Sequence, residues 1–234
     1  MATIPTATER KVHFRARGPN PVTLEGLLGM PEAGKRHPAA VLCHPGMQGQ
    51  TGMEYPVIAA CGAALRRSGL ATLRFNFRGV QGSDGQRGAG QNEVDDVLGA
   101  LDMVRELDEL DASQVYLVGN SFGAWMAAEA AAKDEWVAGL ACIVLPLALL
   151  PSPPEYLCHD DRPKLFIAAG HDAFCSLDKL QDLFDRWAPP KELSVIADSD
   201  HFLGIGPSLD RMNRAPEVAE TVATWLQRTR TGER

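Results

Sequence analysis

The chain has 234 residues, of which 45% are hydrophobic and 23% charged, and its formal net charge is −7 at pH 7. This length and apolar content suit one substantial core, and no Pro/Ser/Gly-rich linker divides the chain, so we expect a single domain over residues 1–234. The acidic balance, with no basic cluster, argues against a nucleic-acid or anionic-membrane partner.

The cysteine pattern and the first residues favour a protein of the cytoplasm. The five cysteines are an odd number without the spacing of a disulfide framework, which fits a reducing compartment. Residues 1–17 lack the apolar core of a secretion signal, and no run approaches the ~18 apolar residues that cross a membrane. We therefore expect a cytoplasmic protein without a membrane partner.

Two segments with alternating apolar residues come first, at 11–16 and 22–29, with Gly-Pro-Asn-Pro between them. They predict an antiparallel pair of strands joined by a turn. Further along, apolar runs alternate with helical patterns, which indicates βαβ units, a mostly parallel sheet and an α/β fold. The runs that predict strands are 39–43, 71–75, 115–118, 140–145, 164–169 and 193–197.

Apolar residues at helical spacing predict the helices between these strands. The expected ranges are 55–68, 92–110, the alanine-rich run after residue 121, 176–187, and a last helix around Val218, Val222, Trp225 and Leu226. The connection at 146–163 is rich in proline and too short for a lid of several helices. We expect a short loop there in place of a lid domain.

The strand predicted at 115–118 leads into Gly119-Asn120-Ser121-Phe122-Gly123 and then into the alanine-rich helix. So sharp a turn forces Ser121 toward positive φ and crowds the residues two before and two after it, where glycine removes the clashing Cβ atoms. The hydroxyl is then held at a helix N-terminus, whose N–H groups favour a developing negative charge. The pentapeptide alone is a weak motif, but in this setting it predicts a serine nucleophile.

A serine nucleophile needs a base, and the base needs an acid that orients it. The last two predicted strands are followed by Asp172 and by the group Asp198, Asp200 and His201. Both places follow strand ends, where parallel α/β sheets hold their sites. The sequence therefore offers an acid and a histidine downstream of the serine.

Serine, acid and histidine in this chain order resemble the α/β-hydrolase superfamily over nearly the whole chain. More narrowly, Cys43-His44-Pro45-Gly46 and the segment 74–85 resemble the small, lidless dienelactone-hydrolase-like and serine-aminopeptidase-like branches. Dienelactone hydrolase itself uses cysteine where this chain has Ser121. The resemblance therefore implies the α/β-hydrolase fold, with a mostly parallel central sheet, helices on both faces and an antiparallel N-terminal hairpin.

The same resemblance assigns the site residues. Ser121 is the implied nucleophile, His201 the implied general base and Asp172 the implied acid that accepts a hydrogen bond from the imidazole. Asp198 and Asp200 remain alternatives for the acid, because Asp172 is also placed to cap its loop.

The loop around His44 is implied to border the oxyanion hole. His44 precedes the nucleophile in the chain, and we expect it to form structural hydrogen bonds. Pro45 stands where the family has glycine and lacks an N–H, so the donor on this side is the backbone of Gly46 or of Met47, with Gly46 preferred. Its partner is the backbone N–H of Phe122.

A glycine-rich stretch and two histidines next to aspartates could suggest phosphate or metal binding, but their spacing does not favour either. The glycine-rich stretch 79–90 lacks the lysine of a phosphate-binding loop and the spacing of a dinucleotide fingerprint, so we expect a loop beside the site. His171 and His159 lie next to aspartates without further ligand spacing. We expect no metal and no cofactor.

These observations predict an enzyme that cleaves a small-molecule carboxylic ester or thioester through an acyl-enzyme on Ser121, with water as the second nucleophile. An amide hydrolase, a peptidase or an acyltransferase would use the same residues. A non-catalytic ligand-binding member of the fold is the alternative from another class.

Overall fold

The computed structural model describes residues 9–31, 36–46, 52–204 and 214–232. Its strands are β1 Glu9–Arg15, β2 Thr23–Gly29, β3 His37–Cys43, β4 Ala71–Phe75, β5 Leu110–Asn120, β6 Val137–Ile143, β7 Lys164–Ala169 and β8 Lys191–Ile196. Its α-helices are α1 Pro56–Arg67, α2 Glu93–Arg105, α3 Phe122–Lys133, α4 Leu177–Arg186 and α5 Ala215–Thr231. None of the helices in these ranges is long and apolar enough to cross a membrane.

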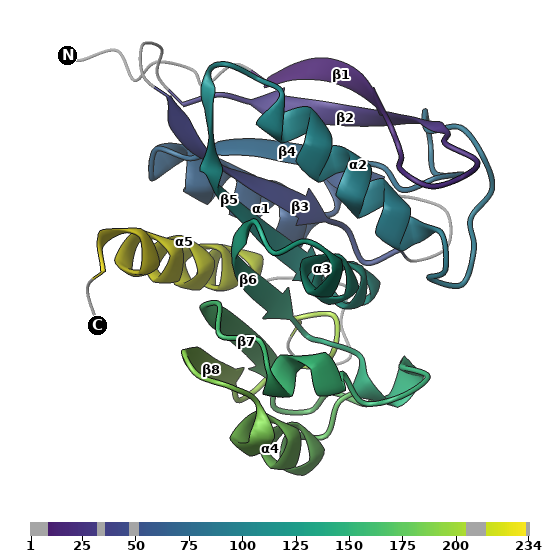
Figure 1. The fold of residues 1–234 in the computed structure, drawn as a ribbon. Helices are drawn as coiled ribbons and strands as arrows, with labels where there is room; N and C mark the ends of the chain where they lie inside the picture. Colours follow the sequence, from purple (N-terminus) through teal and green to yellow (C-terminus); the bar gives the residue numbers. More distant parts are fainter. Residues whose placement is uncertain (1–8, 32–35, 47–51, 205–213, 233–234) are drawn as a thin grey trace.

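The strands form one sheet in the order β1-β2-β4-β3-β5-β6-β7-β8, and helices cover both faces (Figure 1). β2 pairs antiparallel with β1 and with β4, whereas every pair from β4 to β8 is parallel. The structure thus confirms the predicted α/β-hydrolase fold, with a mostly parallel sheet and an antiparallel N-terminal hairpin.

Alternating side chains divide the core into two layers, as the two-residue period of a strand requires. On β3, Val41 and Cys43 face α2 and α3, while Ala40 and Leu42 face α1 and α5. Because helices cover both faces, the central strands are apolar on both sides.

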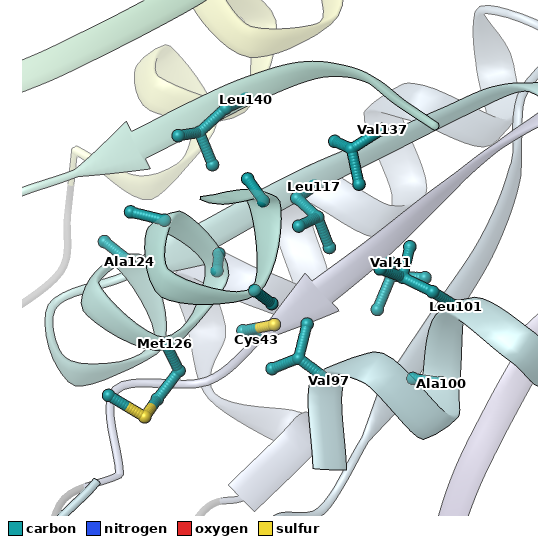
Figure 2. Packing of buried hydrophobic residues seen from close by; sticks show 14 of the residues in the cluster. Val41, Cys43, Val97, Ala100, Leu101, Leu117, Ala124, Met126, Val137 and Leu140 are labelled. Carbon is teal, nitrogen blue, oxygen red and sulfur yellow. The ribbon is translucent and has the colours of Figure 1, made fainter. Parts of the chain in front are cut away.

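Figure 2 shows the layer beneath α2 and α3. Val97 of α2 lies beside Cys43 of β3, Leu101 of α2 lies beside Val41 of β3, and Ala124 of α3 belongs to the same buried cluster. Alanine leaves little side chain between a helix and the sheet, so α3 can lie close to β5 and β6. The chain runs from the end of β5 into α3 through Ser121 alone, so this close packing fixes the direction in which α3 leaves the turn.

The helix predicted at 92–110 is too long. α2 ends at Arg105, and β5 already begins at Leu110, five residues before the predicted strand. Leu107 and Leu110 continue the apolar spacing of the helix, but Leu110 instead pairs with His37 of β3. The N–H of Leu110 donates to the carbonyl of Leu107 in the turn between helix and strand.

The strand predicted at 140–145 is displaced toward the N-terminus. β6 covers Val137–Ile143, and the chain leaves the sheet at Val144, whose φ is 45°. That angle is rare for a β-branched residue. The connection to β7 then contains two short 3-10 helices, Leu147–Leu149 and Glu155–Cys158.

Candidate active site

The turn between β5 and α3 has the geometry expected around Ser121. The φ of Ser121 is 52°, in the left-handed region. A Cβ on Gly119 would lie 2.3 Å from the carbonyl oxygen of Gly123, and a Cβ on Gly123 would lie 2.2 Å from that of Cys43. Both contacts are with backbone, so only glycine fits at either position. The predicted steric reason for this motif is confirmed.

Three side chains from separate loops meet at this turn. The Oγ of Ser121 lies 2.8 Å from Nε2 of His201, and Nδ1 of His201 lies 2.8 Å and 3.0 Å from the two carboxylate oxygens of Asp172. The carboxylate beside Nδ1 favours the tautomer with its proton there, which leaves Nε2 as an acceptor for the serine hydroxyl. This arrangement can move a proton from serine to imidazole.

The three residues lie at one edge of the sheet because each follows the carboxyl end of a parallel strand. Ser121 follows β5, Asp172 follows β7 and His201 follows β8. The last two loops are joined by a hydrogen bond from the N–H of His171 to the carbonyl of Ser199. Asp172 is also held, since its Oδ1 accepts the N–H of Phe174 at 2.7 Å.

The alternative acids have other surroundings. Oδ1 of Asp200 accepts the N–H groups of Phe202 and Gly204, at 2.9 Å and 3.2 Å, so this carboxylate closes the turn that carries His201. The side chain of Asp198 is exposed. The structure brings neither of them to the imidazole in place of Asp172.

His44 lies buried under the site, at 2% exposure. Burial lowers the pKa of its imidazole to about 3, with a smaller contribution from the charge of Arg87. The N–H of Gly46 points at Nδ1 of His44 from 3.1 Å, and the N–H of Phe77 points at Nε2 from 3.2 Å. A neutral imidazole has a single acceptor nitrogen, so it can accept from only one of these groups at a time.

This geometry bears on the expected oxyanion donors. Phe122 is the first residue of α3, and its N–H has no acceptor within the helix. The N–H of Gly46 is available only when His44 carries its proton on Nδ1 and accepts from Phe77. Met47, the other candidate, lies outside the described residues.

A pocket of about 380 Å³ opens on Ser121 and His201. Its other described lining residues are Pro45, Gly46, Arg87, Gly88, Ala89, Phe122, Trp125, Pro146, Leu149, Phe174 and Phe202. The rings of Phe174 and Phe202 stand edge-on to His201, with centroids 4.7 Å and 5.8 Å away. Apolar and aromatic side chains therefore dominate the wall around the serine and histidine.

Apart from Gly46 and Phe122, these wall residues were not predicted from the sequence. A signal existed for some of them, because Phe202 adjoins His201, Phe174 comes two residues after Asp172, and Trp125 lies one helical turn after Ser121. Arg87 belongs to the stretch 79–90 that was expected to form a loop beside the site, but its place on the pocket wall, like that of the exposed Leu149, is seen only in the fold.

The Cys175 thiol near the site is weakly acidic. Burial raises the pKa of the Cys175 thiol to about 11, so it stays protonated near neutral pH. Within the ranges that the structure describes, no group of three or more His, Cys, Asp or Glu side chains could hold a metal ion.

Comparisons with known proteins bear on the fold and the family of the chain. An uncharacterised protein of Rickettsia prowazekii (strain Madrid E) is 28% identical over 171 residues, 70% of this chain and 71% of that protein. The structure of an alpha-beta serine hydrolase homologue from Coxiella burnetii has a TM-score of 0.75 and 24% identity, over 95% of this chain and 99% of that one.

A serine hydrolase without lid from Xanthomonas campestris has a TM-score of 0.73 and 24% identity, over 97% of both chains. A family model described as the alpha/beta hydrolase fold matches residues 39–157, more than half of the 234 residues. The chain therefore belongs to the α/β-hydrolase-fold family.

Proposed function

We propose that the protein is a serine hydrolase that cleaves a carboxylic ester or thioester through an acyl-enzyme on Ser121. The observation that carries this proposal is the continuous contact from Ser121 Oγ to His201 Nε2, and from His201 Nδ1 to Asp172, at 2.8 Å in each step. Family membership supports hydrolase activity. The geometry at these three residues supports the proposal that they perform it.

In the first half-reaction, Nε2 of His201 takes the hydroxyl proton as Oγ of Ser121 bonds to the carbonyl carbon of the substrate. Asp172 keeps the ring oriented and stabilises the imidazolium. The tetrahedral intermediate then collapses, and the bond to the leaving group breaks. The leaving alkoxide or thiolate takes the proton from Nε2, which leaves an acyl group on Oγ.

In the second half-reaction, water takes the place of the leaving group. His201 removes a proton from the water as its oxygen attacks the acyl carbon. When the second tetrahedral intermediate collapses, the bond to Oγ breaks and the proton returns from Nε2 to Ser121. The carboxylic acid leaves, and the site is restored without a cofactor or metal.

The developing oxyanion needs backbone donors on the side of the serine that faces the loop after β3. We propose the N–H of Phe122 as one donor. For the second, Gly46 serves when its N–H turns away from His44, and the amide of Met47 is the alternative. The tautomer of His44 thus determines whether Gly46 can contribute.

The substrate proposal follows from the walls of the pocket. An apolar pocket of about 380 Å³ suits a small acyl ester or thioester. We propose that the chain forms a single domain, with residues 146–163 as a short loop in place of a lid domain, so that the site stays open to small substrates.

A fluorophosphonate tests the nucleophile because it forms a covalent bond with an activated serine. We expect one adduct per chain, on the peptide that contains Ser121, and no adduct in Ser121→Ala. Ser152→Ala removes an exposed serine at the 146–163 loop and should label as the wild type does. A folded wild-type protein that fails to label, or that labels elsewhere, would contradict the proposal.

A further inference from the structure

One cationic side chain stands at the wall of the pocket on Ser121. Among the described lining residues, Arg87 is the only lysine or arginine, and no aspartate or glutamate lies beside it there. The side chain of Arg87 is exposed, and within the described part of the chain it has no ion-pair partner. An arginine without a carboxylate partner is available to a ligand.

The loop that carries Arg87 is held by a buried carboxylate. Glu93, at 0% exposure, accepts the N–H of Gly90 at 3.0 Å and also that of Gly88. Earlier in the same loop, a Cβ on Gly79 would lie 2.6 Å from the backbone nitrogen of Arg87, so the backbone at residue 79 packs closely against the backbone at residue 87. These contacts place the backbone of Arg87 beside the pocket before any substrate arrives.

The guanidinium group is directed toward the nucleophile's neighbour. Its central carbon lies 5.9 Å from the centroid of the Phe122 ring, within the range of a cation–π contact. Phe122 directly follows Ser121. A guanidinium that lies over an aromatic ring still presents the N–H donors along its edge, and this planar fork matches a carboxylate.

We propose that Arg87 binds a carboxylate on the substrate, so that the ester or thioester cleaved at Ser121 carries a second, negatively charged group. This inference rests on the proposed function. A single guanidinium matches the single charge of a carboxylate better than the dianion of a phosphate, and the described wall supplies no second cation. The chain's net charge of −7 repels anions in general. The positive charge of Arg87 opposes this repulsion at the pocket wall and so favours an anionic substrate there.

Matched substrates place the charge on either side of the scissile bond. On the acyl side, 4-nitrophenyl hemiglutarate is compared with 4-nitrophenyl pentanoate; on the alcohol side, 4-acetoxybenzoate is compared with its methyl ester. For each pair, the ratio of kcat/KM for the anionic ester to that for the neutral ester is measured in wild type and in Arg87→Gln. Comparing the proteins cancels the intrinsic reactivity of the esters.

For at least one pair, Arg87→Gln should lower this ratio about 10-fold or more, mainly through KM, as expected for loss of a charge-assisted hydrogen bond. Arg87→Lys should retain part of the ratio. Arg10→Gln removes the same charge from an exposed position on β1, the outermost strand, and should leave the ratio unchanged. An equal ratio in wild type and Arg87→Gln for both pairs would overturn the inference.

A binding measurement separates this inference from the hydrolase proposal. Uncleaved amide analogues of both pairs are titrated into Ser121→Ala and Ser121→Ala/Arg87→Gln, with binding followed by NMR: the monoanilide of glutaric acid against the anilide of pentanoic acid, and 4-acetamidobenzoate against its methyl ester. For at least one pair, we expect the anionic amide to bind more tightly than the neutral one, and only while Arg87 is present. If the wild type turns over no ester, the hydrolase proposal fails. This binding preference alone then decides for or against Arg87.

Discussion

Two buried histidines lie close to the candidate nucleophile, and their surroundings differ. His201 has a carboxylate at Nδ1 and a hydroxyl at Nε2, whereas His44 has a backbone N–H directed at each ring nitrogen. A carboxylate stabilises the imidazolium form, but two N–H donors favour a neutral ring. The same side chain is therefore suited to accept a proton in one place and to hold a loop in the other.

The groups that contact each imidazole, more than its burial, distinguish the proton-accepting histidine from the one that holds a loop. His201 is 9% exposed and His44 2% exposed, so both are enclosed. Only His201 has a partner that can balance a positive charge. Exchanging or removing these partners should therefore separate catalysis from stability.

The largest effect is expected for His201→Gln. Without the base, the hydroxyl of Ser121 keeps its proton, and kcat should fall by about 10⁴- to 10⁶-fold if the three residues act as a unit. The measurement is ester turnover in folded protein, with circular dichroism to verify folding. His44→Gln should reduce kcat far less. Equal losses in both variants would show that the two histidines do not divide the roles in this way.

The next largest effect is expected for Asp172→Asn. The amide can no longer favour the tautomer with the Nδ1 proton, so kcat should fall by about 10⁴-fold. Fluorophosphonate labelling should slow in parallel, because the same base activates Ser121. Asp198→Asn, at an exposed position, is the matched control and should keep its activity. The assignment of the acid is wrong if Asp198→Asn or Asp200→Asn causes the large loss instead.

The pH dependence of stability should reveal His44. Its folded pKa of about 3 lies below the ordinary 6.5, so the unfolded chain binds a proton that the folded chain does not. Its contribution is constant above about pH 6.5 and falls by about 1.4 kcal/mol per pH unit between about pH 6.5 and the folded pKa of about 3. The folded protein therefore becomes less stable as the pH is lowered.

Urea unfolding of wild type and His44→Gln tests this expectation. Between pH 7 and pH 4.5, the difference in unfolding free energy between the two proteins should narrow by about 2–3 kcal/mol, because only the wild type has this titrating group. If the unfolding free energies of the two proteins differ by the same amount throughout this pH range, His44 is not held neutral in the fold.

Sequence reasoning succeeded where a local or topological rule governs a position. Gly119 and Gly123 are dictated by backbone contacts at one turn, and the pattern of the turn is visible in five consecutive residues. That Asp172 and His201 lie at the same edge of the sheet could be inferred because parallel strands end there, whereas the choice of Asp172 over Asp198 and Asp200 came from the resemblance. The predicted fold followed from the alternation of apolar runs.

Sequence reasoning failed where contacts between segments distant in the chain determine the structure. The apolar spacing through Leu110 predicts helix, but pairing with His37 of β3 turns this residue into the start of a strand. The contact of the Gly46 N–H with His44 depends on loop geometry that no motif specifies. Arg87 lines the pocket on a loop that is held by the carboxylate of Glu93, on α2.

The most direct test of the central claim is the mass of the protein quenched in acid during turnover of 4-nitrophenyl acetate. We expect one acetyl group per chain, on the peptide that contains Ser121, and the loss of both this group and turnover in Ser121→Ala. An acetyl group on another residue, or undiminished turnover in Ser121→Ala, would contradict it.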